Sequence, residues 1–242
     1  MKRAVALIFA VAIMVSAGLL AYGYKTRGVT SGQITVKGLG SQEFESDLVV
    51  WSIRITAQNE DLQAGVDKLA NDRKVVEAYF VNQGISKDDL VFSSVEHDEA
   101  TKPIYNEEGN YVGREFVAHK FLQTVTIESE DLDLIGEVSR KVSDLLNDGI
   151  YLKSYRPKYY YSKLDDLKLQ LIEEASQNGR QRAEQIAAHS ASKLGGLKSA
   201  KQGVFQILGK NSEDSFSWGG TFNTSNRYKV ASVTVSMEYE VD

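Results

Sequence analysis

The first 27 residues constrain this chain most. Met1-Lys2-Arg3 is positively charged, residues 4–24 contain no Lys, Arg, Asp or Glu, and Lys25 and Arg27 follow. A positive start followed by an apolar run is typical of a secretory signal or a single membrane anchor. We therefore expect residues 28–242 to fold outside the cytoplasm, in the periplasm or at the extracytoplasmic face of the inner membrane.

Two interpretations of this segment stay open. Its 21 apolar residues are close to the roughly 20 that a helix needs to cross a bilayer, which favours an uncleaved anchor at residues 4–24. Val15-Ser16-Ala17 and Ala21-Tyr22-Gly23 have the small residues of a cleavage site, which suits a signal peptide. We expect the anchor, with the cleaved signal as the alternative. The chain has no cysteine, which excludes lipoprotein attachment.

Composition limits the chemistry of the exported part. Four of the 28 Lys and Arg and none of the 33 Asp and Glu lie in the first 27 residues, so the remainder carries a formal net charge of −9. This acidic balance argues against nucleic acid or anionic lipid headgroups as partners, since both need a positively charged surface. The absence of cysteine excludes disulfides, thiol catalysis and thiolate metal sites. We expect no cofactor and no bound metal.

Hydrophobic periodicity predicts the secondary structure from residue 31 onward. Strands are expected at residues 31–39, 48–57, 90–96, 111–129, 151–161, 204–208 and 228–241. Helices are expected from residue 59 or 61 to 83, from 130 or 131 to 147, and from about 164 to 194. Helices separated by hairpins indicate an α+β fold, with helices on one face of mainly antiparallel sheets.

Glycines and loops suggest where these elements end. Gly38-Leu39-Gly40 is expected to break the first strand, and Gly195-Gly196 to end the long helix. We expect a single domain over residues 28–242 after the leader at residues 1–27. It divides, if at all, into subdomains of about 31–130 and 131–242.

Several stretches together resemble the SIMPL-domain family, which includes bacterial periplasmic immunogenic proteins. They are Ile34 to Gly40, Glu45 to Leu48, Gly84-Ile85 with Asp88 to Leu90, Leu122 to Ile127 with Asp131 to Gly136, Arg180 to Gly195, and Val233 to Tyr239. Ser46 departs from the pattern, because many members carry proline there. The resemblance implies an α/β sandwich, an envelope location and, in some members, a ring- or channel-like homo-oligomer. It supplies no catalytic residues.

Two groups of aromatic residues are candidates for an interface or a ligand surface. Tyr151, Tyr155, Tyr159 and Tyr161 are expected on one face of their strand, either covered by the long helix or free to form an interface. Phe216, Trp218 and Phe222 lie in a loop rich in Ser, Gly and Asn. This loop would either dock a partner or fold back over its own domain.

The histidines and the long helix have weaker functional interpretations. His97 with Asp98 and Glu99 could bind a divalent cation, but we favour a solvated turn. His119 is expected as a core or interface residue. The small residues of the long helix would pack on its own sheet or pair with another subunit.

No enzyme motif was found, so we expect a non-enzymatic envelope protein that acts through self-assembly or partner binding. The alternative is a periplasmic binding module for a small ligand, glycan or peptide. That module would use the tyrosine strand and the aromatic loop.

Overall fold

The computed structural model describes residues 2–27 and 32–241. Its first helix, α1 (Lys2–Arg27), occupies the predicted apolar segment, and its side chains are described over residues 11–23. Among the described residues no helix is both long enough and apolar enough to span a membrane. The anchor predicted at residues 4–24 extends beyond those described side chains.

The chain forms two compact units, each assembled from segments that are distant in the sequence. The first unit takes residues up to 41, 170–204 and 233–242, and the second takes residues 42–169 and 205–232. Neither unit is bounded at residue 130. Three elements contribute to both units: β1 (Gly32–Glu45), α4 (Leu164–His189) and β11 (Tyr228–Val241).

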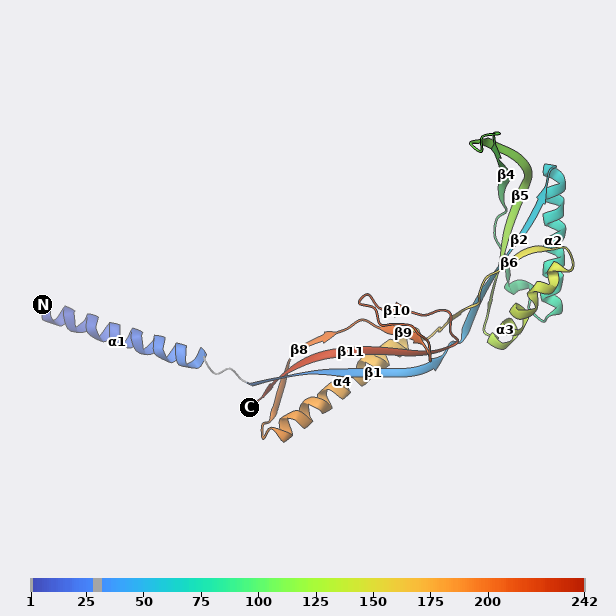
Figure 1. Ribbon diagram of the computed structural model, residues 1–242. Helices are drawn as coiled ribbons and strands as arrows, with labels where there is room; N and C mark the ends of the chain where they lie inside the picture. The colour runs from blue at the N-terminus through green and yellow to red at the C-terminus, as the bar shows by residue number, and fades with distance from the viewer. Residues whose placement is uncertain (1, 28–31, 242) are drawn as a thin grey trace. The chain divides into compact units, whose positions relative to one another are not determined.

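The second unit contains a six-stranded sheet built around β2 (Leu48–Asn59). β2 pairs antiparallel with β5 (Tyr111–Ser129) on one side and with β6 (Tyr151–Ser154) and β7 (Lys158–Tyr160) on the other. β5 also pairs with β3 (Leu90–Phe92) and β4 (Glu96–Tyr105). Two helices, α2 (Leu62–Asn82) and α3 (Leu132–Lys141), cover one face of the sheet (Figure 1).

The core of this unit follows from the alternation in β2. Its inward side chains are all fully buried: Val49, Trp51, Ile53, Ile55 and Ala57. The helices pack against this face with residues spaced by three, four or seven: Leu69, Val76 and Phe80 from α2, and Leu132, Ile135 and Val138 from α3. Burying each large apolar side chain contributes about 1.5–3 kcal/mol.

In the first unit β11 lies between β1 and β8 (Leu194–Gln202), with α4 against these strands (Figure 1). Glycines set how closely α4 approaches. A Cβ added at Gly38 would lie 1.9 Å from the carbonyl oxygen of Ala175, and one at Gly40 would lie 2.2 Å from that of Leu171. The helix backbone therefore rests directly on β1. Ala175, Ala183 and Ala187 are buried, as expected for a helix packed on its own sheet.

Short elements complete the second unit. β9 (Gln206–Gly209) pairs antiparallel with the first residues of β11 and parallel with β10 (Thr221–Phe222). Short 3-10 helices lie at Lys87–Asp89 and Val142–Leu146. With two sheets, a long C-terminal helix and an N-terminal helix, the α+β prediction is confirmed.

Two local predictions were wrong, and strand β4 was missed. β1 continues through Gly38 and Gly40, because these glycines accommodate the helix rather than a turn. The long helix ends at His189, and Gly195 and Gly196 lie in strand β8. β4 was not predicted, because its side chains are mostly exposed and lack an apolar alternation.

We predict that Gly38→Ala destabilises the first unit by about 2 kcal/mol, because the added methyl group meets helix backbone that has no rotamer to move. Gly196→Ala is the matched control, since a Cβ there has no described atom within 4 Å. Hydrogen exchange should be faster over residues 170–189 in Gly38→Ala alone. Equal exchange rates in both variants would show that the close contact at Gly38 does not determine the stability of the first unit.

Candidate functional site

The tyrosine strand does not present its four rings on one face, so that prediction was wrong. Tyr151 pairs with Thr56, on the outer face of β2, whereas Tyr159 pairs with the buried Val49. The register slips by one residue between the two short strands β6 and β7. One extra residue reverses the facing of every side chain after it, and Pro157, which lacks an N–H donor, lies in this break.

The four tyrosines have different surroundings. Tyr151 is 75 % exposed, whereas Tyr159 packs on the core. Tyr155 lies beside Arg54 and Lys153 at cation–π distance, and its carbonyl accepts a 3.0 Å hydrogen bond from the indole N–H of Trp51. Tyr161 packs on Phe44. They do not form a single ligand surface.

The aromatic loop holds its rings outward. Phe216 is 74 % exposed, Trp218 is fully exposed and Phe222 in β10 is half exposed. The loop is nevertheless held in place, because the buried Gln206 side chain donates to the carbonyl of Ser217 (2.7 Å) and accepts from its N–H (3.3 Å). The three rings are therefore not folded back over their own domain, and docking to a partner stays a prediction.

Asp214 fixes the base of the same loop. Its carboxylate accepts hydrogen bonds from the backbone N–H of Gly209 (3.0 Å) and from the side-chain amide of Asn223 (2.7 Å). The bond from Gly209 and a further one with Ser212 lower the pKa of Asp214. The loop therefore presents Trp218 from an ordered base.

His97 lies in strand β4 and not in a turn, which corrects the interpretation as a solvated turn. Its Nε2 is 3.2 Å from Nδ1 of His119, and its ring stacks on Phe121. Within residues 2–27 and 32–241 no group of three or more His, Asp or Glu side chains is placed to hold a metal ion.

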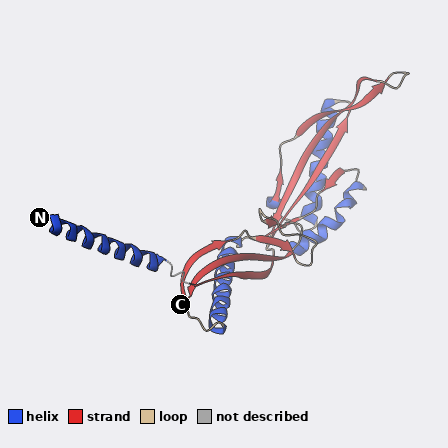
Figure 2. Cartoon of the chain, turned by 60° about the vertical axis from the view of Figure 1, so that its left-hand side comes forward, coloured by secondary structure: helices blue, strands red, loops and turns tan. Residues whose placement is uncertain are grey.

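Sequence reasoning missed an arm formed by β4 and β5. β2 pairs with β5 only as far as His119, so among the described strands β4 is the sole partner of the first part of β5. Figure 2 shows these two strands continuing past the rest of their sheet. The arm carries six large apolar side chains that are 40–59 % exposed: Ile104, Tyr105, Tyr111, Val112, Phe116 and Val117.

The register places three aromatic rings on one face of this arm. Phe116 lies opposite Thr101 and Tyr111 lies opposite Tyr105, while odd-numbered residues of β4 share a face. Tyr105 and Tyr111 meet edge to face, with centroids 6.2 Å apart. The turn at residues 107–110, flanked by tyrosines, was the available signal. Without a predicted first strand it did not indicate a hairpin.

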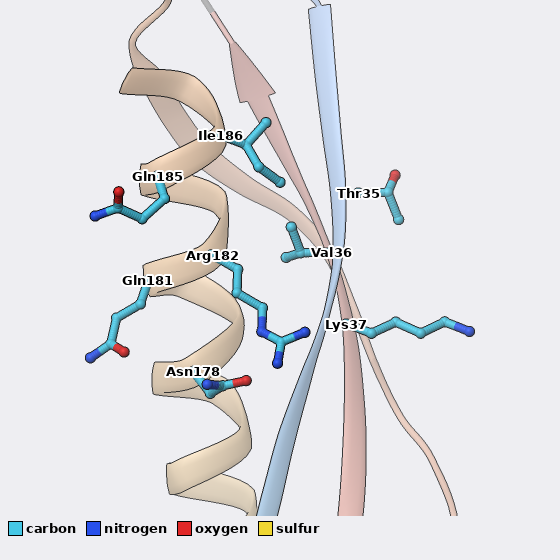
Figure 3. Close-up of a pocket in the computed structure, with 8 residues that line it drawn as sticks. All are labelled: Thr35, Val36, Lys37, Asn178, Gln181, Arg182, Gln185 and Ile186. Carbon is cyan, nitrogen blue, oxygen red and sulfur yellow. The ribbon is translucent and has the colours of Figure 1, made fainter. Parts of the chain in front are cut away.

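The first unit has a surface groove of about 760 Å³ between α4 and β1. Figure 3 shows Asn178, Arg182 and Ile186 pointing from the helix toward Val36, whereas Gln181 and Gln185 point away from the strand. The Asn178 Oδ1 already accepts a 3.2 Å hydrogen bond from the N–H of Leu39. The polar side chains that point into the groove are therefore Arg182 and Asn178, and the Asn178 oxygen is already hydrogen-bonded to β1.

A smaller acidic pocket of about 440 Å³ lies in the second unit around Arg227. The guanidinium pairs with Glu45 (2.5 Å) and with Asp133. These contacts raise the pKa of Arg227 and lower the pKa of Asp133. Asp47 accepts two hydrogen bonds from Ser162, and Asp131 caps α3. Four of its five carboxylates thus have structural partners.

Lys229 is the most unusual titratable group. It is almost fully buried, and its Nζ donates a 2.5 Å hydrogen bond to the carbonyl of Tyr159. Burial lowers its pKa from 10.5 to about 8. Its contacts are with backbone and core, so we assign it a structural role.

Lys229 predicts a pH dependence of stability. Because its pKa is lower in the folded state, the unfolded chain binds the additional proton between pH 8 and 10.5, and the free energy of unfolding should rise across that window. Lys229→Met should remove this rise and be more stable than the wild type near pH 7. Exposed Lys158→Met is the control, and urea titrations at each pH provide the measurement. An unchanged pH profile in Lys229→Met would contradict the assignment.

Comparison with known proteins places this arrangement in a family. No curated protein matches the chain. The model of the SIMPL family, described as a protein of unknown function (DUF541), matches residues 34–240. That match takes in both compact units and every element from β2 to β10. The chain therefore belongs to the SIMPL family.

Proposed function

We propose that this chain is a non-enzymatic cell-envelope protein that acts through self-assembly, with the β4–β5 arm as its main contact surface. Residues 4–24 would anchor it to the inner membrane, and the two units would lie on the extracytoplasmic side. The observation that carries the proposal is the row of exposed apolar side chains along the arm.

The arm lacks internal support for its exposed rings. An isolated two-stranded ribbon is at best marginally stable in water, because it has no third layer on which to bury its side chains. Phe116, Tyr105 and Tyr111 extend the face that α2 covers further along the sheet, but they remain exposed. A second molecule on this face would supply the missing layer.

The chemistry of the arm favours a protein partner. Tyrosine and phenylalanine are enriched at the centre of protein interfaces, where flat apolar area is combined with polar edges. The opposite face of the arm carries the ion pair between Lys102 and Glu115 (2.9 Å). Ile104 lies on this second face as well, and Arg114 lies opposite Pro103 on the face with the three rings. The two faces therefore differ in their aromatic content, and the aromatic face is the one proposed for contact.

Trp218 provides a second contact surface. A fully exposed tryptophan on a hydrogen-bonded loop loses little conformational freedom when it docks, which is the property of an interface anchor. The alternative function, small-ligand binding by the tyrosine strand and this loop, is less well supported. Tyr151 and Tyr159 lie on opposite faces of their sheet.

We predict that residues 28–242 form a discrete oligomer, measured as molar mass by light scattering on a sizing column. Tyr105→Ser with Phe116→Ser should shift the mass toward the monomer, because both rings leave the arm's apolar face. Tyr151→Ser is the control, since Tyr151 is even more exposed (75 %, against 59 % for Tyr105 and 44 % for Phe116) but lies outside the arm.

The outcomes of this experiment are distinct. A monomeric wild-type fragment would contradict self-assembly. An oligomer unaffected by the arm variant would keep self-assembly but move the contact elsewhere, and Trp218→Ser would then be tested next. Circular dichroism checks that each variant retains its fold.

The anchor is tested separately. We predict that intact-mass spectrometry of the chain from the membrane fraction gives a mass that includes residues 4–24, and that alkaline carbonate leaves it in the membrane. A mature chain that begins after Gly23 would show that the segment is a cleaved signal peptide.

A further inference from the structure

A groove runs beside α2 in the second unit, with a volume of about 660 Å³. The helix contributes one stripe of side chains to it: Val66, Leu69, Ala70, Arg73, Lys74 and Glu77. Spacings of three and four place these residues along one side of the helix. The stripe is apolar over its first turn and charged over the rest.

The apolar end of the groove is closed by the sheet. Leu69 and Phe121 are nearly buried and form its floor, and Val66 and Val95 are partly exposed at its sides. Gly65 lets the helix come close to the sheet here, because a Cβ at this position would lie 2.5 Å from the ring of Phe121. His97, which stacks on Phe121, and Gln123 add polar edges to the lining. The aliphatic and aromatic side chains at this end suit a hydrocarbon chain.

The other end is cationic. Arg73, Lys74 and Lys87 line it, and Lys87 pairs with Glu77 (2.5 Å). The guanidinium of Arg73 lies over the ring of Phe92, 4.3 Å from its centroid. Across the part of the chain that the structure describes, neither Arg73 nor Lys74 forms an ion pair with a carboxylate. Two unneutralised cations thus sit together in an exported segment whose net charge is −9.

We propose that this groove binds a single-chain anionic amphiphile, with its alkyl tail between Val66 and Phe121 and its head group at Arg73 and Lys74. The volume lies within the range of small-molecule sites, and the sites of such ligands combine apolar walls with a few polar groups. Charge complementarity selects an anionic head, for which a carboxylate is the simplest case. The groove is separate from the exposed face of the arm and does not depend on self-assembly.

The test uses the full-length chain in phosphatidylcholine nanodiscs. A decanoate analogue with a diazirine on its tail is photoactivated, and labelled peptides are identified by mass spectrometry. Label is expected in the peptides that contain Val66 and Val95. Excess decanoate should suppress this labelling, whereas decanol and decyltrimethylammonium, which have the same tail without the negative charge, should not.

Matched variants separate the two ends of the groove. Val66→Glu should reduce labelling of these peptides about tenfold, and Val75→Glu on the same helix should not, although the two valines are 42 % and 41 % exposed. Arg73→Gln with Lys74→Gln should also weaken competition by decanoate about tenfold, compared with no change for Lys163→Gln. Ala70→Phe fills the groove without adding charge. It replaces Val66→Glu in this test if Val66→Glu does not fold.

Three results would overturn the proposal. Equal suppression by decanol would show that charge plays no part. Equal labelling in Val66→Glu, Ala70→Phe and the wild type would place the label outside the groove. Suppression by phosphatidylglycerol added to the nanodiscs, without suppression by decanoate, would assign the cations to a lipid surface.

Discussion

The second unit depends on one constraint: every second residue of β2 must enter a dry core. Five inward side chains from Val49 to Ala57 are completely buried, and the Trp51 indole N–H is satisfied there by Ser154 and Tyr155. With a period of two, this burial fixes the register of every strand that pairs with β2. It also fixes which face α2 and α3 cover.

The same register determines which apolar side chains lie on the surface of this unit. The sheet face that α2 covers continues along β5 into the arm. Phe121 therefore lies under α2, whereas Phe116 and Tyr111 lie on the arm beyond the helix. The groove and the arm are thus two stretches of one sheet face, which differ in whether a helix lies alongside. Where α2 is present, the strip forms the groove that we propose binds a small amphiphile. Where it is absent, the strip is the surface that we propose contacts another protein.

The sequence predicted those parts of the structure whose pattern has a local cause. The period of α2, its cap at Asp61 and the alternation of β2 were all recognisable, because each reports burial on one side. The strand break predicted at Gly38 was wrong, because the sequence alone does not distinguish a glycine that allows a helix to approach closely from one that forms a turn. The tyrosine strand was misplaced by a one-residue slip near Pro157, which depends on pairing with β2. The arm was missed because only its strand β5 was predicted, whereas the mostly exposed β4 has no apolar alternation.

The two tryptophans lie at the opposite extremes of burial, Trp51 at 0 % and Trp218 at 101 % exposure. Indole emission depends on the polarity around the ring, so the chain carries a pair of spectroscopically distinct fluorophores. Trp51 should emit from an apolar environment until the second unit unfolds. Trp218 should emit as in water whether or not the chain is folded, and should respond only when something covers its loop. A single emission spectrum would therefore separate loss of structure from contact at the loop.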